Sequence, residues 1–115
     1  MSNESDIVRL QFIYDLIDDL EEILAKYRDI NEAFEDVAGY HALTMCLLQI
    51  GEKMAKIQSP EYKKRLPVKK IYHFRNILAH EYENIDIQLA KSLIQNSMPG
   101  LKKEIEEILS KGKKQ

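Results

Sequence analysis

Apolar residues near the start of the chain recur at intervals of three and four, and this spacing is the strongest constraint on the fold. The stripe lies within a segment from about Ser5 to Tyr27 and consists of Leu10, Ile13, Ile17, Leu20, Leu24 and Tyr27. This spacing gathers the six side chains on one face of an α-helix, which a partner helix must cover. Ser5 or Asp6 is a suitable N-cap for this first helix.

The same periodicity predicts helices along most of the remaining chain. A second helix should run from Asp29 or Asn31 to about Ile57, and it should be sandwiched because both of its faces carry apolar residues. Residues 58–66 contain a Ser-Pro pair and a run of charges, which predicts a loop. A third helix is expected over residues 68–78, with Pro67 in its first turn.

The last part of the chain predicts a fourth helix capped by Asp86 and, after a break at Pro99-Gly100, a short final helix. We find no alternation typical of strands and no internal repeat. A chain of 115 residues has the size of one domain. We therefore predict an all-α protein, an antiparallel four-helix-type bundle with a short extra C-terminal helix. Residues 1–115 would form this single domain, with residues 1–4 and 111–115 mobile.

Several classes of protein are disfavoured by composition. No apolar run approaches the ~20 residues that a membrane-spanning helix needs, and the N-terminus does not resemble a signal peptide. Cys46 is the only cysteine and has apolar neighbours, which predicts a buried thiol in a reducing cytoplasm. The three histidines show no metal-ligand spacing, and His41 is expected to be a core residue. Neither a metal nor a cofactor is expected.

The modest net charge of −2 conceals a strong asymmetry along the chain. Residues 1–39 hold three bases and eleven acids, a net charge of −8. Residues 53–75 hold eight bases and one acid, a net charge of +7. A basic segment of this kind suits a polyanionic substrate. The alternative is that the two segments neutralise each other across the bundle or between subunits.

The basic segment leads into Arg75–Tyr82, which contains Arg75, Asn76, His80 and Tyr82. Arginine can bind a phosphate through two hydrogen bonds and histidine titrates near neutral pH, so these residue types suit metal-free phosphodiester cleavage. On one continuous helix Arg75 and His80 would lie about 140° apart. Either the helix ends near Ala79, or a second copy of the chain completes the site. A purely structural arginine and histidine are the alternative.

The pattern Arg-x4-His-x-Tyr, with an asparagine directly after the arginine, resembles the signature of HEPN-domain ribonucleases, specifically the HepT toxins. Residues 48–52 resemble the Ile-Gly-Glu segment on the second helix of that family, and residues 66–68 resemble its proline-led third helix. Residues 82–86 resemble the exit from the motif. The similarity extends over residues 34–109, while the first helix matches in pattern alone. Val68 departs from the family, in which many members have a tryptophan.

The resemblance implies a HEPN-like bundle that forms a homodimer, or a higher even-numbered oligomer, and cuts tRNA or mRNA in the cytoplasm without a metal. It would be the toxin of a toxin–antitoxin pair. Arg75, Asn76 and His80 would be catalytic, and Glu52 would pair with Arg75 in support or cap a neighbouring helix. Tyr82 would accept an adenylyl group from an MntA-like nucleotidyltransferase antitoxin. The candidates for RNA binding in the basic segment are Lys53, Lys56, Lys69 and Lys70.

Two other functions remain open at this point. Some HEPN-like helical proteins are non-catalytic partners that bind substrate for a small nucleotidyltransferase. The presence of both Arg75 and His80 disfavours this alternative, because a binding subunit does not need the pair. The third possibility is a plain dimerising bundle that associates through the apolar stripe of the first helix.

Overall fold

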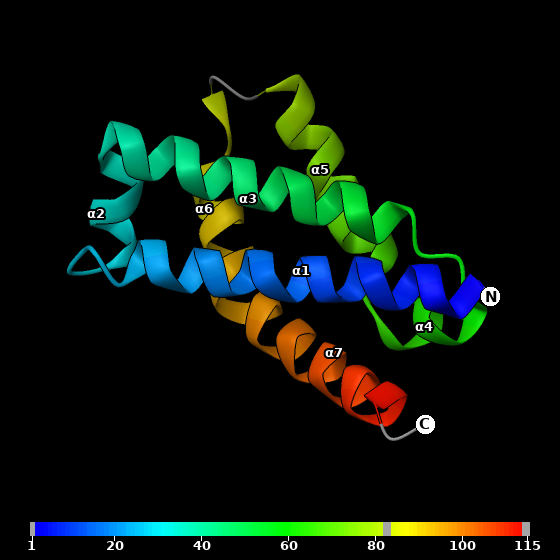
Figure 1. The fold of residues 1–115 in the computed structure, drawn as a ribbon. Helices are drawn as coiled ribbons and strands as arrows, with labels where there is room; N and C mark the ends of the chain where they lie inside the picture. Colours follow the sequence, from blue (N-terminus) through cyan, green and yellow to red (C-terminus); the bar gives the residue numbers. More distant parts are fainter. Residues whose placement is uncertain (1, 82–83, 114–115) are drawn as a thin grey trace.

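A computed structural model describes residues 2–81 and 84–113 of the chain, and the side chains of residues 5–81 and 84–111. These residues form helices and no strand, which confirms the all-α prediction (Figure 1). The elements in chain order are α1 (Ser2–Leu24), α2 (Ile30–Glu35), α3 (Val37–Ala55), α4 (Pro60–Arg65), α5 (Val68–His80), α6 (Ile87–Ser92), the π-helical turn η2 (Leu93–Ser97) and α7 (Met98–Lys113).

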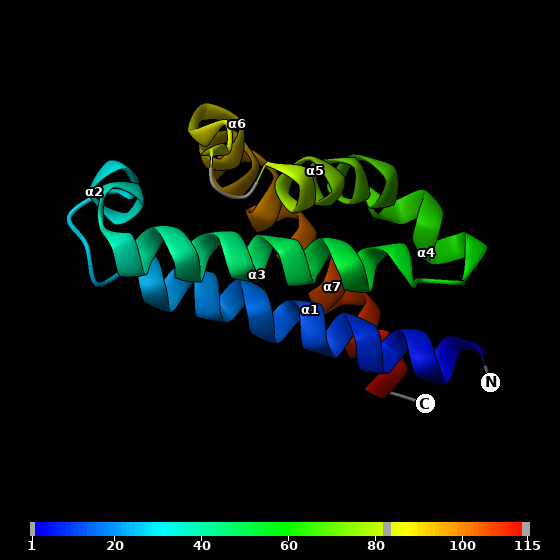
Figure 2. The same ribbon diagram turned by 90° about the horizontal axis from the view of Figure 1, so that it is seen from above.

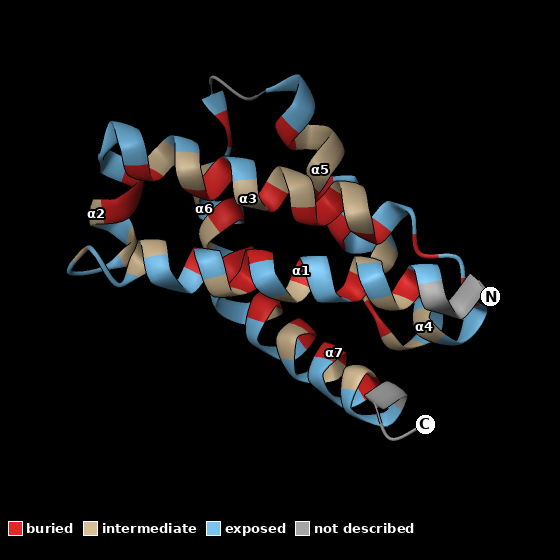
Figure 3. Cartoon of the chain, viewed as in Figure 1, coloured by how far each residue is buried: buried red, intermediate tan, exposed pale blue. Residues whose placement is uncertain are grey.

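Four long helices build the core, and α3 lies between α1 and α5. Helices α1 and α3 run antiparallel side by side, α5 packs against α3, and α7 packs against α1 (Figures 1 and 2). The apolar stripe of α1 behaves as predicted, since Leu10, Ile13, Ile17 and Leu20 are at most 1% exposed. Leu24 and Tyr27, at the end of the stripe, are half-buried. The facing surfaces of α1 and α3 are the buried ones (Figure 3).

The predicted second helix is in fact two helices, because Asp36 interrupts it. Asp36 has an extended backbone and caps α3, accepting hydrogen bonds from the Gly39 amide at 3.1 Å and the Tyr27 hydroxyl at 2.7 Å. A Cβ atom on Gly39 would lie 2.2 Å from the carbonyl oxygen of Ala33, so only glycine lets α2 fold back against α3. Asp29 caps α2 by accepting from the Glu32 amide, as predicted.

Helix α3 packs against both α1 and α5, as expected for a sandwiched helix, but one of its two apolar faces is not buried. Its buried positions, which include Leu43, Leu47, Ile50 and Met54, occupy one side, because α1 and α5 cover the same half of the helix. The opposite side is exposed at His41, so the prediction of a core histidine is wrong. Cys46 is half-buried rather than buried. Its partial burial raises the thiol pKa to about 11, with a smaller contribution from the negative charge of Asp19.

The segment predicted as a loop contains α4. Ser59 caps this helix by accepting from the Tyr62 amide, and Pro60 occupies its first turn. Serine followed by proline is itself a signal for a helix start, and the charged run concealed it.

The predicted break at Pro99-Gly100 is also wrong. The helical path continues through η2, where the Met98 amide bonds to the Leu93 carbonyl, five residues back. Proline has no amide hydrogen to donate, and a π-helical turn directly before Pro99 accommodates that loss. The C-terminal helix α7 is therefore long, and the short helices are α2, α4 and α6.

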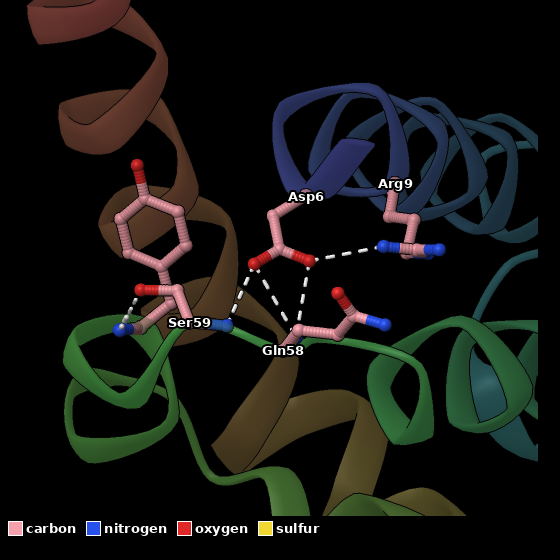
Figure 4. A network of polar contacts seen from close by, with 5 residues as sticks. Asp6, Arg9, Gln58 and Ser59 are labelled. Carbon is pink, nitrogen blue, oxygen red and sulfur yellow. Dashed lines mark hydrogen bonds and ion pairs between the residues drawn. The ribbon is translucent and has the colours of Figure 1, made fainter. Parts of the chain in front are cut away.

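Asp6 does not cap α1 but lies within it, fully buried, and connects α1 to a distant part of the chain. Its carboxylate accepts hydrogen bonds from the backbone amides of Gln58, at 3.0 and 3.3 Å, and Ser59, at 2.8 Å. Arg9 donates to the same carboxylate at 3.0 Å (Figure 4). Asp6 thereby fixes the connection between α3 and α4 against the first helix.

The ends of the chain are only partly described. Residues 2–4 and 111–113 belong to α1 and α7, while residues 1, 114 and 115 lie outside the described residues, so the mobility of the ends stays a prediction. Within the described part of the chain, no helix combines the length and apolar character needed to cross a membrane.

We expect Asp6→Ala to lower the free energy of unfolding by about 2–4 kcal/mol, because two backbone amides would lose a charged acceptor inside the protein. Urea denaturation followed by circular dichroism measures this change. Asp15→Ala is the matched control, since Asp15 lies on the same helix and accepts from Gln11 at the exposed surface. Equal stability of the two variants would contradict the proposed role of Asp6.

Candidate functional site

The site begins with a close contact between α3 and α5 at Gly51. A Cβ atom on Gly51 would lie 2.3 Å from Cβ and 2.8 Å from Cγ of Arg75, closer than side chains can pack. Only glycine allows the two helices to approach this closely. Glu52, the next residue on α3, is thereby brought beside the guanidinium group of Arg75 on α5.

Arg75 is oriented by two neighbours. Its Nη2 donates to Oε1 of Glu52 at 2.9 Å, which confirms the expected pair, and its Nη1 donates to Oδ1 of Asn76 at 3.0 Å. The third donor, Nε, is shielded from solvent and has no hydrogen-bond partner among the described residues. A buried donor without a partner costs about 1–3 kcal/mol. The position is therefore not optimised for stability, as is common at functional sites.

His80 does not meet Arg75 within one chain. Helix α5 ends at His80, close to the expected end near Ala79, but Arg75 and His80 both still lie on this one helix. About 140° of helix rotation separates Arg75 from His80, and no hydrogen bond joins them. Asn76, which contacts Arg75, lies one turn before His80 on the same side of α5. His80 is exposed.

Two neighbouring depressions lie beside Arg75. The smaller one, about 310 Å³, is lined by Glu52, Ala55, Lys56, Tyr72 and Arg75. The larger one, about 630 Å³, is lined by Ala55, Lys63, Leu66, Pro67, Val68, Lys69, Lys70 and Tyr72. They share Ala55 and Tyr72, so together they form one groove, which we call the α4–α5 groove.

The structure separates the four lysines that the sequence suggested for RNA binding. Lys56, Lys69 and Lys70 line the α4–α5 groove, and the Lys70 ammonium also contacts Oγ of Ser97 at 3.1 Å. Lys53 lines neither depression, and its ammonium lies 4.8 Å from the ring centre of Phe12 on α1. Sequence reasoning missed Lys63 and Tyr72. Tyr72 could have been noticed, since it lies one helical turn before Arg75.

The ion pairs show whether the acidic side chains of residues 1–39 and the basic side chains of residues 53–75 contact each other. Lys102 of α7 pairs with Asp18 and Glu21 of α1, each at 2.8 Å. Arg65 of the basic segment pairs with Glu104 at 2.7 Å and Glu107 at 3.1 Å, both on α7. Among the described residues, no ion pair joins the acidic first third of the chain to the basic segment. Among the described side chains, the two segments are therefore not joined by direct pairing.

Two further sequence predictions concern this region. Tyr82, the predicted acceptor of an adenylyl group, lies outside the described residues. In the described part of the chain, no three or more histidine, cysteine, aspartate or glutamate side chains form a group that could hold a metal ion.

We expect Gly51→Ala to destabilise the protein by about 1–3 kcal/mol, because the added methyl group must push α3 away from Arg75. Gly100→Ala is the matched control, since its Cβ would meet nothing within 4 Å, and alanine favours a helix by about 0.5–1 kcal/mol. Urea denaturation of both variants measures the difference. A Gly51→Ala protein as stable as the wild type would show that the close contact is not required.

Comparisons with known proteins identify the family of this chain. A family model described as "Ribonuclease HepT-like" matches residues 13–108. Among curated proteins of Methanocaldococcus jannaschii, "Putative RNase MJ1380" is 30% identical over 83% of this chain and 91% of its own length. "Putative RNase MJ0125" is 29% identical over 85% of this chain and 88% of its own length. No solved structure matches. The match over most of the chain shows that this protein belongs to the HepT-like ribonuclease family.

Proposed function

We propose that the protein is a metal-independent endoribonuclease, the toxin of a cytoplasmic toxin–antitoxin pair, which cleaves tRNA or mRNA in the cleft of a homodimer or a higher even-numbered oligomer. The observation that carries this proposal is the arrangement on α5. Arg75 is oriented by Glu52 and Asn76, while His80 is exposed on another side of the same continuous helix. Membership of a ribonuclease family supplies the reaction class.

A second subunit can supply what one chain lacks. Arg75 and His80 of the same subunit point in different directions, because they lie about 140° apart around the axis of α5. Two copies that meet through α5 about a twofold axis would place both motifs in one cleft. The composite site would then contain two arginines and two histidines.

Cleavage at this site needs two proton transfers. One histidine takes the proton of a ribose 2′-hydroxyl group, and the 2′-oxygen forms a bond to phosphorus. The bond between phosphorus and the 5′-oxygen breaks, and the second histidine, in its protonated form, donates a proton to that oxygen. The products are a 2′,3′-cyclic phosphate and a 5′-hydroxyl group. His80 of each subunit would fill one of these roles.

The other residues of the site act on charge and orientation. Arg75 would stabilise the negative charge that builds on the phosphorane oxygens. Glu52 and Asn76 hold its guanidinium group through the two Nη atoms, which limits its side-chain rotation before substrate arrives. Lys56, Lys69 and Lys70 would attract and hold the RNA backbone.

The toxin role also predicts a partner. A nucleotidyltransferase antitoxin would transfer an adenylyl group to Tyr82, next to the catalytic motif in the sequence. The added phosphate would carry negative charge close to His80 in the chain and would repel RNA.

The proposal predicts that wild-type protein cuts total tRNA in EDTA and that His80→Ala reduces the rate at least about 100-fold, the loss expected for a general acid or base. His73→Ala is the matched control, because His73 is another exposed histidine on α5 with no assigned role. Gel analysis measures the rates, and analysis of the product ends should find 2′,3′-cyclic phosphates.

The intact mass of the wild type is measured first, so that adenylylated protein is not mistaken for an inactive enzyme. Products that end in 3′-hydroxyl groups would contradict the mechanism. If unmodified protein cut neither tRNA nor mRNA, the function as a binding partner of a nucleotidyltransferase would replace the ribonuclease proposal.

A further inference from the structure

The α4–α5 groove extends from Arg75 toward α4 and is lined mainly by apolar and basic residues. Its apolar lining consists of Ala55, Leu66, Pro67 and Val68. Its basic lining consists of Lys56, Lys63, Lys69, Lys70 and Arg75. Among the described residues, Glu52 is the one acid that lines it, and it is already paired with Arg75.

Apart from Arg75, the basic side chains that line the groove form no ion pair with an acid among the described residues. Among the described residues, Lys56, Lys63 and Lys69 take part in no ion pair. Lys70 donates a hydrogen bond to the uncharged hydroxyl group of Ser97. Arg65 has a different role, since Glu104 and Glu107 hold it against α7. The groove is therefore suited to an anion that extends over several phosphates.

Tyr72 lies where the two depressions meet and is 42% exposed. It precedes Arg75 by three residues on α5, about 4.5 Å along the helix axis and on the same side. An exposed aromatic ring bordered by lysines is the usual arrangement for binding a single strand, in which a base stacks on the ring while cations follow the backbone. Bases of a duplex are stacked on one another and cannot reach such a ring.

We infer that the α4–α5 groove binds a single-stranded segment of RNA beside the cleaved bond, with one base stacked on Tyr72 and its phosphates held by Lys56, Lys63 and Lys69. This inference rests on the proposed ribonuclease function. It adds a specificity for unpaired RNA, because a nucleotide that stacks on Tyr72 must be free of a pairing partner. The groove then selects loops, bulges and ends of folded RNA as cleavage sites.

Fluorescence anisotropy tests the inference with a labelled 12-nucleotide RNA, single-stranded or in a blunt duplex, and with the full chain carrying His80→Ala to prevent cleavage. In this background, Tyr72→Leu keeps apolar bulk and removes the ring. It should weaken single-strand binding about tenfold to hundredfold and leave duplex binding unchanged. Tyr72→Phe should bind single strands like its parent, since the aromatic face remains.

The lysines are tested by the salt dependence of the same binding. Lys63→Gln should reduce the slope of log affinity against log salt concentration by about 0.7, the value for one phosphate contact on a single strand. Lys64→Gln is the matched control, because Lys64 is the next residue on α4, is exposed and lines neither depression. Its slope should stay unchanged.

Three outcomes would overturn the inference. Tyr72→Leu could bind single strands like its parent, or it could weaken duplex and single-strand binding equally. It could also weaken binding of a labelled polyglutamate to the same degree as RNA, which would identify a surface for acidic polypeptides.

Cleavage separates this inference from the proposed function. If the wild-type protein cuts RNA and Tyr72→Leu binds single strands as tightly as its parent, the groove inference is wrong and the ribonuclease proposal stands. If the wild-type protein cuts no RNA but Tyr72→Leu weakens single-strand binding, the ribonuclease proposal is wrong and the groove still binds single strands.

Discussion

The structure depends on the contact between α3 and α5 at Gly51, where the backbone of one helix lies against the Arg75 side chain of the other. This contact has two consequences. It fixes the separation of the two helices, and it brings Glu52 within hydrogen-bonding distance of the Arg75 guanidinium group. A larger residue at position 51 would change both together. The local resemblance to an Ile-Gly-Glu segment thus has a physical basis, since the glycine permits the approach and the glutamate then orients the arginine.

Several features of the fold could be predicted because they depend on neighbouring residues. The stripe of α1 has the spacing of a helix, and its first four members are buried. The features that were missed depend on competing or distant signals. At Asp36, apolar periodicity continues through a residue that nevertheless caps a new helix. The hydrogen bonds that Asp6 accepts could not be foreseen, because the backbone amides that donate them lie 52 and 53 residues away.

In the candidate site, too, some features could be predicted from the sequence and others could not. The pairing of Arg75 with Glu52 was expected from the resemblance and is observed. The lysines could not be sorted from the sequence, because Lys53 on α3 lies against Phe12 of α1, whereas Lys56, just after α3, lines the same depression as Arg75. Lys63 joins the site only because its segment is a short helix rather than a loop. Whether a residue belongs to the groove depends on helix phase and packing, which composition does not reveal.

The central claim is that two subunits share one site, with His80 of one as base and His80 of the other as acid. It is tested most directly by the tRNA cleavage rate of a purified heterodimer with one wild-type and one His80→Ala chain. A shared site predicts a rate about 100-fold below that of the wild-type dimer, because one of the two proton transfers is lost in every cleft. A rate of half the wild-type value would show that each subunit acts alone and would contradict the account.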